Sequence, residues 1–91
     1  MKNIIGKKEA KVIDVRDEWE YQEGHINDAV NIPLHELPAH INQLKKLEGP
    51  LILYCRSGNR SATAVNLLRQ AGINNVFNGG SMSEMQKIVL N

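Results

Sequence analysis

Residues 51–54 are apolar at every position, and this run constrains the fold more than any other feature of the sequence. A strand that is solvated on one face alternates apolar and polar residues, whereas a strand covered on both faces is apolar throughout. Residues 51–54 are therefore predicted to form a central strand of a parallel sheet. The runs 12–15, 29–32 and 75–78 are predicted to be its other strands.

Segments with helical patterns alternate with these strands. Four helices are expected, after the capping-box pairs Asp17/Glu20 and Ser81/Glu84 and at the apolar repeats 37–44 and 64–71. Strands that alternate with helices of this length form βα units with right-handed crossovers. The sequence therefore predicts an α/β fold with a small central parallel sheet of four to five strands flanked by helices.

Length and charge exclude several classes of protein. The 91 residues leave room for one domain, which we expect to span 1–91. The net charge of +1 creates no general attraction for nucleic acid or an anionic membrane, so neither is expected as a partner. No apolar stretch approaches the ~18 residues of a membrane span. We expect a soluble monomer, cytoplasmic as the chain stands, or periplasmic if an export signal has been removed.

The single cysteine, Cys55, directly follows the most apolar strand. Ligands of open α/β sheets bind at the carboxyl ends of the strands, so this is a favourable position for a reactive group. The turn-prone residues that follow are Ser57, Gly58 and Asn59. Their amides and the start of the next helix are predicted to form an anion cradle, which lowers the pKa of a thiol. Arg56 and Arg60 add two cations, which suit an anionic sulfur donor and an anionic persulfide.

Each of these residues also has a purely structural interpretation. Lone cysteines are often buried and inert, but the polar residues after Cys55 favour an exposed, reactive thiol. Arg56 is equally consistent with a solvated surface charge. Asp14 and Arg16, at the end of the first strand, either support the loop or form an ordinary surface ion pair. Trp19 is interpreted as packing in the core or at its rim.

Taken together, residues 55–60 resemble the six-residue active-site loop of rhodanese-type sulfurtransferases. The segments 13–16, 20–21, 24–26 and 29–33, and the pair Gly79 and Gly80, match that family's pattern in order and spacing. The chain is most similar to the small single-domain thiosulfate sulfurtransferases of the phage-shock-protein E type. It departs from many relatives in two ways. The strand and helix before residue 11 are missing or reduced to 1–10, and no Trp follows Gly80.

The resemblance implies a rhodanese-like three-layer fold and a ping-pong reaction. In such a reaction Cys55 takes a sulfane sulfur from thiosulfate or a persulfide donor and passes it to cyanide or to a thiol, such as glutathione or a thioredoxin-like protein. No cofactor is implied. No metal is expected either, because the three histidines are too few and too badly spaced for a metal site.

Two other functions stay open at this point. A Cys-dependent phosphatase or arsenate reductase of the same fold also uses a cradled thiolate, but such enzymes close the loop with an Arg six positions after the Cys. Here that position is Ser61, and the Arg comes one residue earlier. The smaller loop is expected to admit one sulfur atom but no phosphate. A sulfur-relay module without turnover would have the same sequence as an enzyme.

Overall fold

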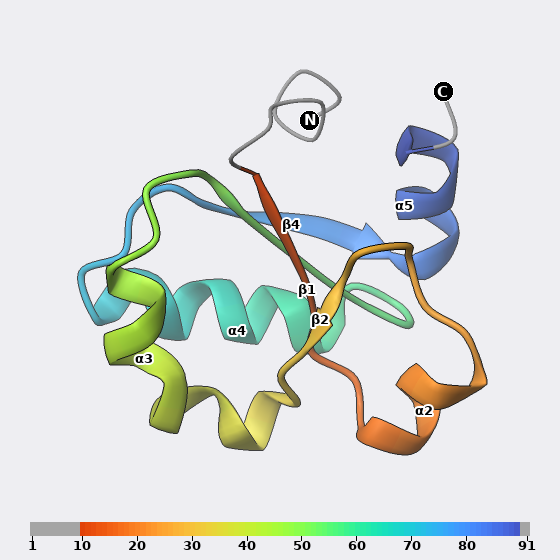
Figure 1. Cartoon of the computed structure of the whole chain (residues 1–91), viewed down its shortest axis with the longest axis horizontal. Helices are drawn as coiled ribbons and strands as arrows, with labels where there is room; N and C mark the ends of the chain where they lie inside the picture. The colour runs from red at the N-terminus through yellow and green to blue at the C-terminus, as the bar shows by residue number, and fades with distance from the viewer. Residues whose placement is uncertain (1–9, 90–91) are drawn as a thin grey trace.

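The computed structural model describes residues 10–89, with side chains described as far as residue 87. Its elements alternate along the chain, as Figure 1 shows: β1 (Lys11–Asp14), α2 (Glu18–Glu23), β2 (Val30–Asn31), the 3-10 helix η1 (Leu34–Glu36), α3 (Leu37–Lys45), β3 (Leu51–Cys55), α4 (Asn59–Gln70), β4 (Val76–Ser81) and α5 (Met82–Val89). The strands form one sheet in the order β2-β1-β3-β4, and every pairing is parallel. The predicted α/β fold with a parallel sheet of four to five strands is confirmed, and residues 10–89 supply four of them.

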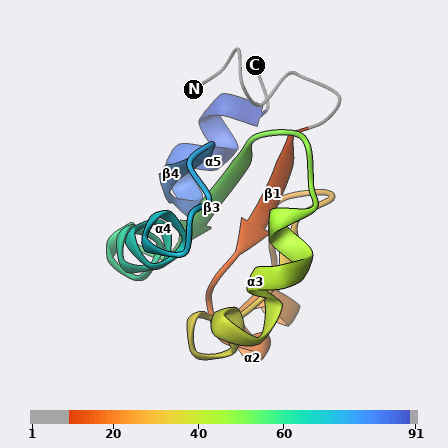
Figure 2. The ribbon, with the colours of Figure 1, turned by 90° about the vertical axis from the view of Figure 1, so that its left-hand side faces the viewer.

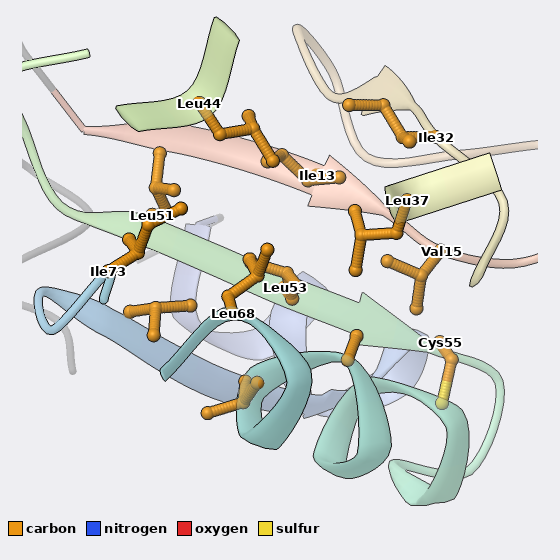
Figure 3. Packing of buried hydrophobic residues seen from close by; sticks show 13 residues of the cluster. Ile13, Val15, Ile32, Leu37, Leu44, Leu51, Leu53, Cys55, Leu68 and Ile73 are labelled. Atoms are coloured by element: carbon orange, nitrogen blue, oxygen red, sulfur yellow. The ribbon is translucent and has the colours of Figure 1, made fainter. Parts of the chain in front are cut away.

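The central strand β3 is buried along its whole length, because helices cover both faces of the sheet. Leu51, Leu53 and Cys55 point into a large apolar cluster that α3 and α4 complete (Figure 3). Ile52 and Tyr54 point the other way, into a smaller cluster with Met85 of α5. Figure 2 shows α4 and α5 on opposite sides of β3. This alternation places the end of β3, and with it Cys55, beneath the start of α4.

Strand β4 runs further than the sequence pattern predicts. The expected strand ended at Asn78, before two glycines, but β4 continues to Ser81 through a bulge at which Gly79 has no partner. A Cβ atom on Gly79 would lie 2.5 Å from the Met85 sulfur and 3.0 Å from Ile52 Cγ2, so a larger residue would require these side chains to shift. The two glycines therefore extend the strand and allow α5 to pack closely, where the pattern had indicated a turn.

Both predicted capping boxes are present. The Asp17 amide donates to Glu20 at the start of α2, and the Ser81 amide and hydroxyl exchange hydrogen bonds with Glu84 at the start of α5. The segment before residue 10, where relatives have a further strand and helix, lies outside the described residues. Between residues 10 and 89, no helix is both long and apolar enough to cross a membrane.

Candidate active site

Cys55 ends β3, and three residues later Gly58 leads into α4 (Figure 3). Gly58 has φ +96°, a left-handed conformation that other residues adopt only with strain. This conformation turns the chain back over the cysteine, so that the Gly58 amide lies 3.0 Å from the Cys55 sulfur and donates to it. The Ser61 amide donates from 3.4 Å. The predicted cradle of amides therefore forms around the sulfur atom itself.

The Cys55 side chain is buried, and the expectation of an exposed thiol is wrong. Its exposed fraction is 0%, and it belongs to the apolar cluster beneath α4. The polar residues that follow it do face solvent, since Arg56, Ser57 and Asn59 are exposed. They form the outer side of the loop, whereas the sulfur lies on the inner side. Polar neighbours in the sequence indicated the position of the loop, but not the direction in which Cys55 points.

Hydrogen bonds make this buried thiol acidic. Burial alone raises the pKa of the Cys55 thiol, because it disfavours the charged form. The Ser61 side chain and the amides of Ser61, Gly58 and Ser57 oppose this effect by donating to the sulfur, and they outweigh it. The pKa of Cys55 is therefore lower than the ordinary value for cysteine. The same contacts that bury the sulfur also favour its thiolate.

Ser61 and Asn78 hold the loop in this shape, and the sequence analysis had assigned neither residue to the site. The Ser61 hydroxyl lies 2.6 Å from Asn78 Oδ1, 3.1 Å from the Gly58 carbonyl and 3.5 Å from the Cys55 sulfur. Asn78 in turn donates to the Gly58 carbonyl and accepts from the Gly80 amide. Because a hydroxyl has one proton, Ser61 donates to only one of its acceptors at a time. A new charge on the sulfur would compete with Asn78 for that proton.

Arg60 is paired with Glu20 of α2, a partner that the sequence analysis did not identify. Its two terminal nitrogens donate to the two carboxylate oxygens of Glu20 at 2.7 and 3.0 Å. The exposed fractions of the side chains are 34% for Arg60 and 8% for Glu20. Hydrogen bonds from Arg60 lower the pKa of Glu20 to about 2, despite its burial. Arg60 therefore stands at the loop as half of a neutral pair, whereas the sequence had suggested an open cation.

Asp14 and Arg16 form a buried ion pair, so the surface interpretation of these residues is wrong. Arg16 Nη2 lies 2.7 Å from Asp14 Oδ2 and also donates to the Gly24 carbonyl at 2.7 Å. The Tyr54 hydroxyl donates to the same Asp14 oxygen from 2.8 Å and accepts from the Ile26 amide. Burial raises the pKa of Tyr54, which keeps this hydroxyl protonated as a donor. The network joins β1 to β3 one residue before Cys55, without touching the sulfur.

A pocket of about 360 Å³ lies beside the loop, lined by α2, α5 and Arg56. Arg56 has no ion pair or hydrogen bond within the described part of the chain, so its charge is available to a ligand. Trp19 also lines the pocket and is 58% exposed, so it does not pack in the core. Met82 provides a further apolar surface, whereas Glu23 provides an anion. Cys55 itself does not line this pocket.

Comparisons with known proteins agree with this geometry. The model of the rhodanese-like domain family matches residues 1–87. The chain is 38% identical to the uncharacterised protein YqhL of Bacillus subtilis over 73 residues, which is 80% of this chain and 57% of that protein. It is 32% identical to the thiosulfate sulfurtransferase PspE of Escherichia coli, over 80% of this chain and 71% of that protein. The chain thus spans little more than half the length of the first relative.

A solved structure of a rhodanese with anions from Escherichia coli has a similar fold. It superposes with a TM-score of 0.75 and 32% identity, and the match covers 82% of this chain and 89% of that one. The described sheet and its helices are thus arranged as in a rhodanese.

Proposed function

The chain belongs to the rhodanese-like family, which includes sulfurtransferases, and from this premise we propose that it transfers a sulfane sulfur by way of a persulfide on Cys55. The observation that carries this proposal is the set of amides around the sulfur. Two backbone N–H groups and one hydroxyl lie within 3.5 Å of Cys55 Sγ, and the pKa of the thiol is lowered. A thiolate is the nucleophile that sulfur transfer requires.

In the first half-reaction, the Cys55 thiolate attacks the outer sulfur of thiosulfate. A bond forms between the two sulfur atoms as the bond to the SO₃ group breaks, and sulfite leaves with the electron pair. In the second half-reaction, a thiolate acceptor attacks the outer sulfur of the Cys55 persulfide and regenerates the Cys55 thiolate. Neither half-reaction needs a general base, because the amides already favour the charged form of Cys55.

Substrates are proposed to enter beside Arg56. This residue follows Cys55 directly, lies at the pocket between α2 and α5, and has an unpaired charge that suits an anionic donor. The exposed indole of Trp19 and the side chain of Met82 offer apolar contacts to the carbon skeleton of a thiol acceptor. The amides of residues 57–59 complete the proposed substrate loop, and Asp14 and Arg16 support it from the end of β1.

Phosphate chemistry is less well supported by the loop. The position at which phosphatases of this fold have an arginine is Ser61, whose side chain is buried and hydrogen-bonded to Gly58 and Asn78. That position therefore offers no cation to a phosphate. A relay module would contain the same persulfide but would need a partner protein to load or unload it, so turnover with small molecules separates the two possibilities.

Mass spectrometry of the intact protein after incubation with thiosulfate tests the proposal. We expect a mass gain of one sulfur atom, which cyanide or a small thiol removes with multiple turnovers, and no gain in Cys55→Ser. Thr63→Ala is the matched control, since Thr63 lies on the exposed side of α4. Hydrolysis of p-nitrophenyl phosphate, with no sulfur on Cys55 from any donor, would contradict the proposal. Loading without turnover would identify a relay module.

A further inference from the structure

We propose that Glu20 determines which donor charge the site prefers. Glu20 neutralises Arg60, so that the site favours singly charged sulfur donors over the thiosulfate dianion. This inference rests on the proposed sulfur transfer and adds a specificity-determining residue to it. Glu20 lies 40 positions before Arg60 in the sequence and belongs to a different element, α2. Within residues 10–89, its hydrogen bonds to the substrate loop are those with Arg60.

Hydrogen bonds and burial hold the Glu20 carboxylate against Arg60. Both of its oxygens accept from Arg60, and one of them also accepts from the Asp17 amide at the start of α2. The carboxylate is nearly buried, so neither solvent nor a salt ion readily replaces its partner. Arg60 is consequently held as a member of a neutral pair on the first turn of α4, where an unpaired cation would attract anions most strongly.

The other charged side chains near the loop contribute no net positive charge. Arg16 is neutralised by Asp14 in the buried network. Arg56 is an open cation, but Glu23 lines the same pocket and has the opposite sign. With Arg60 paired, the formal charges of these groups cancel. A dianion therefore gains no net attraction over a monoanion, and it loses more hydration on entering the loop.

Glu20→Gln separates the charge of Glu20 from its structural role. Glutamine serves at this position of a capping box, so the hydrogen bond from the Asp17 amide is kept. The negative charge opposite Arg60 is lost. Glu48→Gln is the matched control, because it removes the same charge from an exposed position that precedes β3, at the opposite end of that strand from Cys55.

The assay compares thiosulfate, a dianion, with methanethiosulfonate, a monoanion that presents the same sulfane sulfur. Attack on the second donor releases methanesulfinate in place of sulfite. We expect Glu20→Gln to raise kcat/KM for thiosulfate relative to methanethiosulfonate by roughly three- to tenfold, mainly through KM, and less so at high salt. An unchanged or lower ratio, or an equal rise in Glu48→Gln, would overturn the proposal.

Alkylation of Cys55 tests the effect of the Glu20 charge without any sulfur transfer. Iodoacetate and iodoacetamide are similar in size, but only iodoacetate is an anion. We expect Glu20→Gln to raise the ratio of their rates at Cys55 by about two- to fivefold, whereas a purely structural role of Glu20 would change both rates together. An unchanged ratio overturns the inference. Absence of a persulfide in the unaltered protein with both donors instead overturns the proposed function, so the two failures are distinguishable.

Discussion

Removal of the Ser61 hydroxyl is expected to make Cys55 a weaker acid. In Ser61→Ala the sulfur keeps its hydrogen bonds from the Gly58 and Ser61 amides but loses the contact with the Ser61 hydroxyl, which lies 3.5 Å away. The Ser61 hydroxyl is also the largest of the contributions that lower the pKa of this thiol. The substitution should therefore raise the pKa of Cys55 toward the ordinary value. Burial still raises this pKa, whereas fewer hydrogen bonds remain to lower it.

The size of the effect follows from the competition for one proton. A hydrogen bond to a charged group contributes about 1.5–3 kcal/mol. When the thiolate forms, however, the Ser61 proton has to leave Asn78, whose oxygen is only 2.6 Å away. The net loss is therefore nearer to about 1 kcal/mol, which corresponds to roughly a fivefold change in the thiolate-to-thiol ratio. Asn78 still holds the loop through the Gly58 carbonyl and the Gly80 amide.

The assay is the rate of alkylation by iodoacetamide as a function of pH. Below the pKa of the thiol, Ser61→Ala should react about five times more slowly than the unaltered protein, and the two rates should converge at high pH, where both are thiolate. Thr63→Ala removes a hydroxyl from the same end of α4, where it contacts the Asn59 carbonyl, and should leave the profile unchanged. Coincident profiles for Ser61→Ala and the unaltered protein would refute the reasoning.

Two further predictions concern stability. Because the pKa of Glu20 is about 2 in the folded protein and has its ordinary value of 4.5 in the unfolded chain, the stability from this group is present above pH 4.5 and is lost as the pH falls toward 2. Arg60→Gln should remove about 1–2 kcal/mol of that acid-sensitive stability in urea titrations at pH 7 and pH 3, a range reduced because Arg60 is partly solvated; equal losses at both pH values would contradict this. Gly79→Ala should lower the free energy of unfolding by about 1–3 kcal/mol, because its Cβ atom meets Met85 and Ile52; no measurable loss in urea titrations would show that these side chains move aside freely.

Local patterns in the sequence were sufficient to predict most of the fold. An apolar run is buried on both faces wherever helices cover a sheet, and β3 is such a strand. The capping pairs at α2 and α5 are also local, and both were predicted correctly. Strand β4 was predicted too short, because Gly79 and Gly80 have the composition of a turn. Their actual role depends on the closeness of α5, which no local pattern contains.

The candidate site was predictable only where its residues are neighbours in the sequence. The sequence placed Cys55 at the start of a loop that the structure forms as a cradle of amides. It gave no sign that Glu20 would reach Arg60, or that Asn78 would reach Ser61, because these pairs lie 40 and 17 positions apart and depend on the order of the strands. The burial of Cys55 was missed because it depends on which face of β3 the last side chain occupies.

The parallel sheet also determines when the pKa of the Cys55 thiol becomes low during folding. Parallel strands cannot be joined by hairpins, and the pairing of Ile13 with Leu53 closes a loop of 40 residues before it contributes any stability. Asn78, which holds the loop around the sulfur, is on β4, the last strand that the structure describes. A nascent or partly folded copy therefore has an ordinary thiol at Cys55. Under the proposed function, the nucleophile therefore arises only with completed folding.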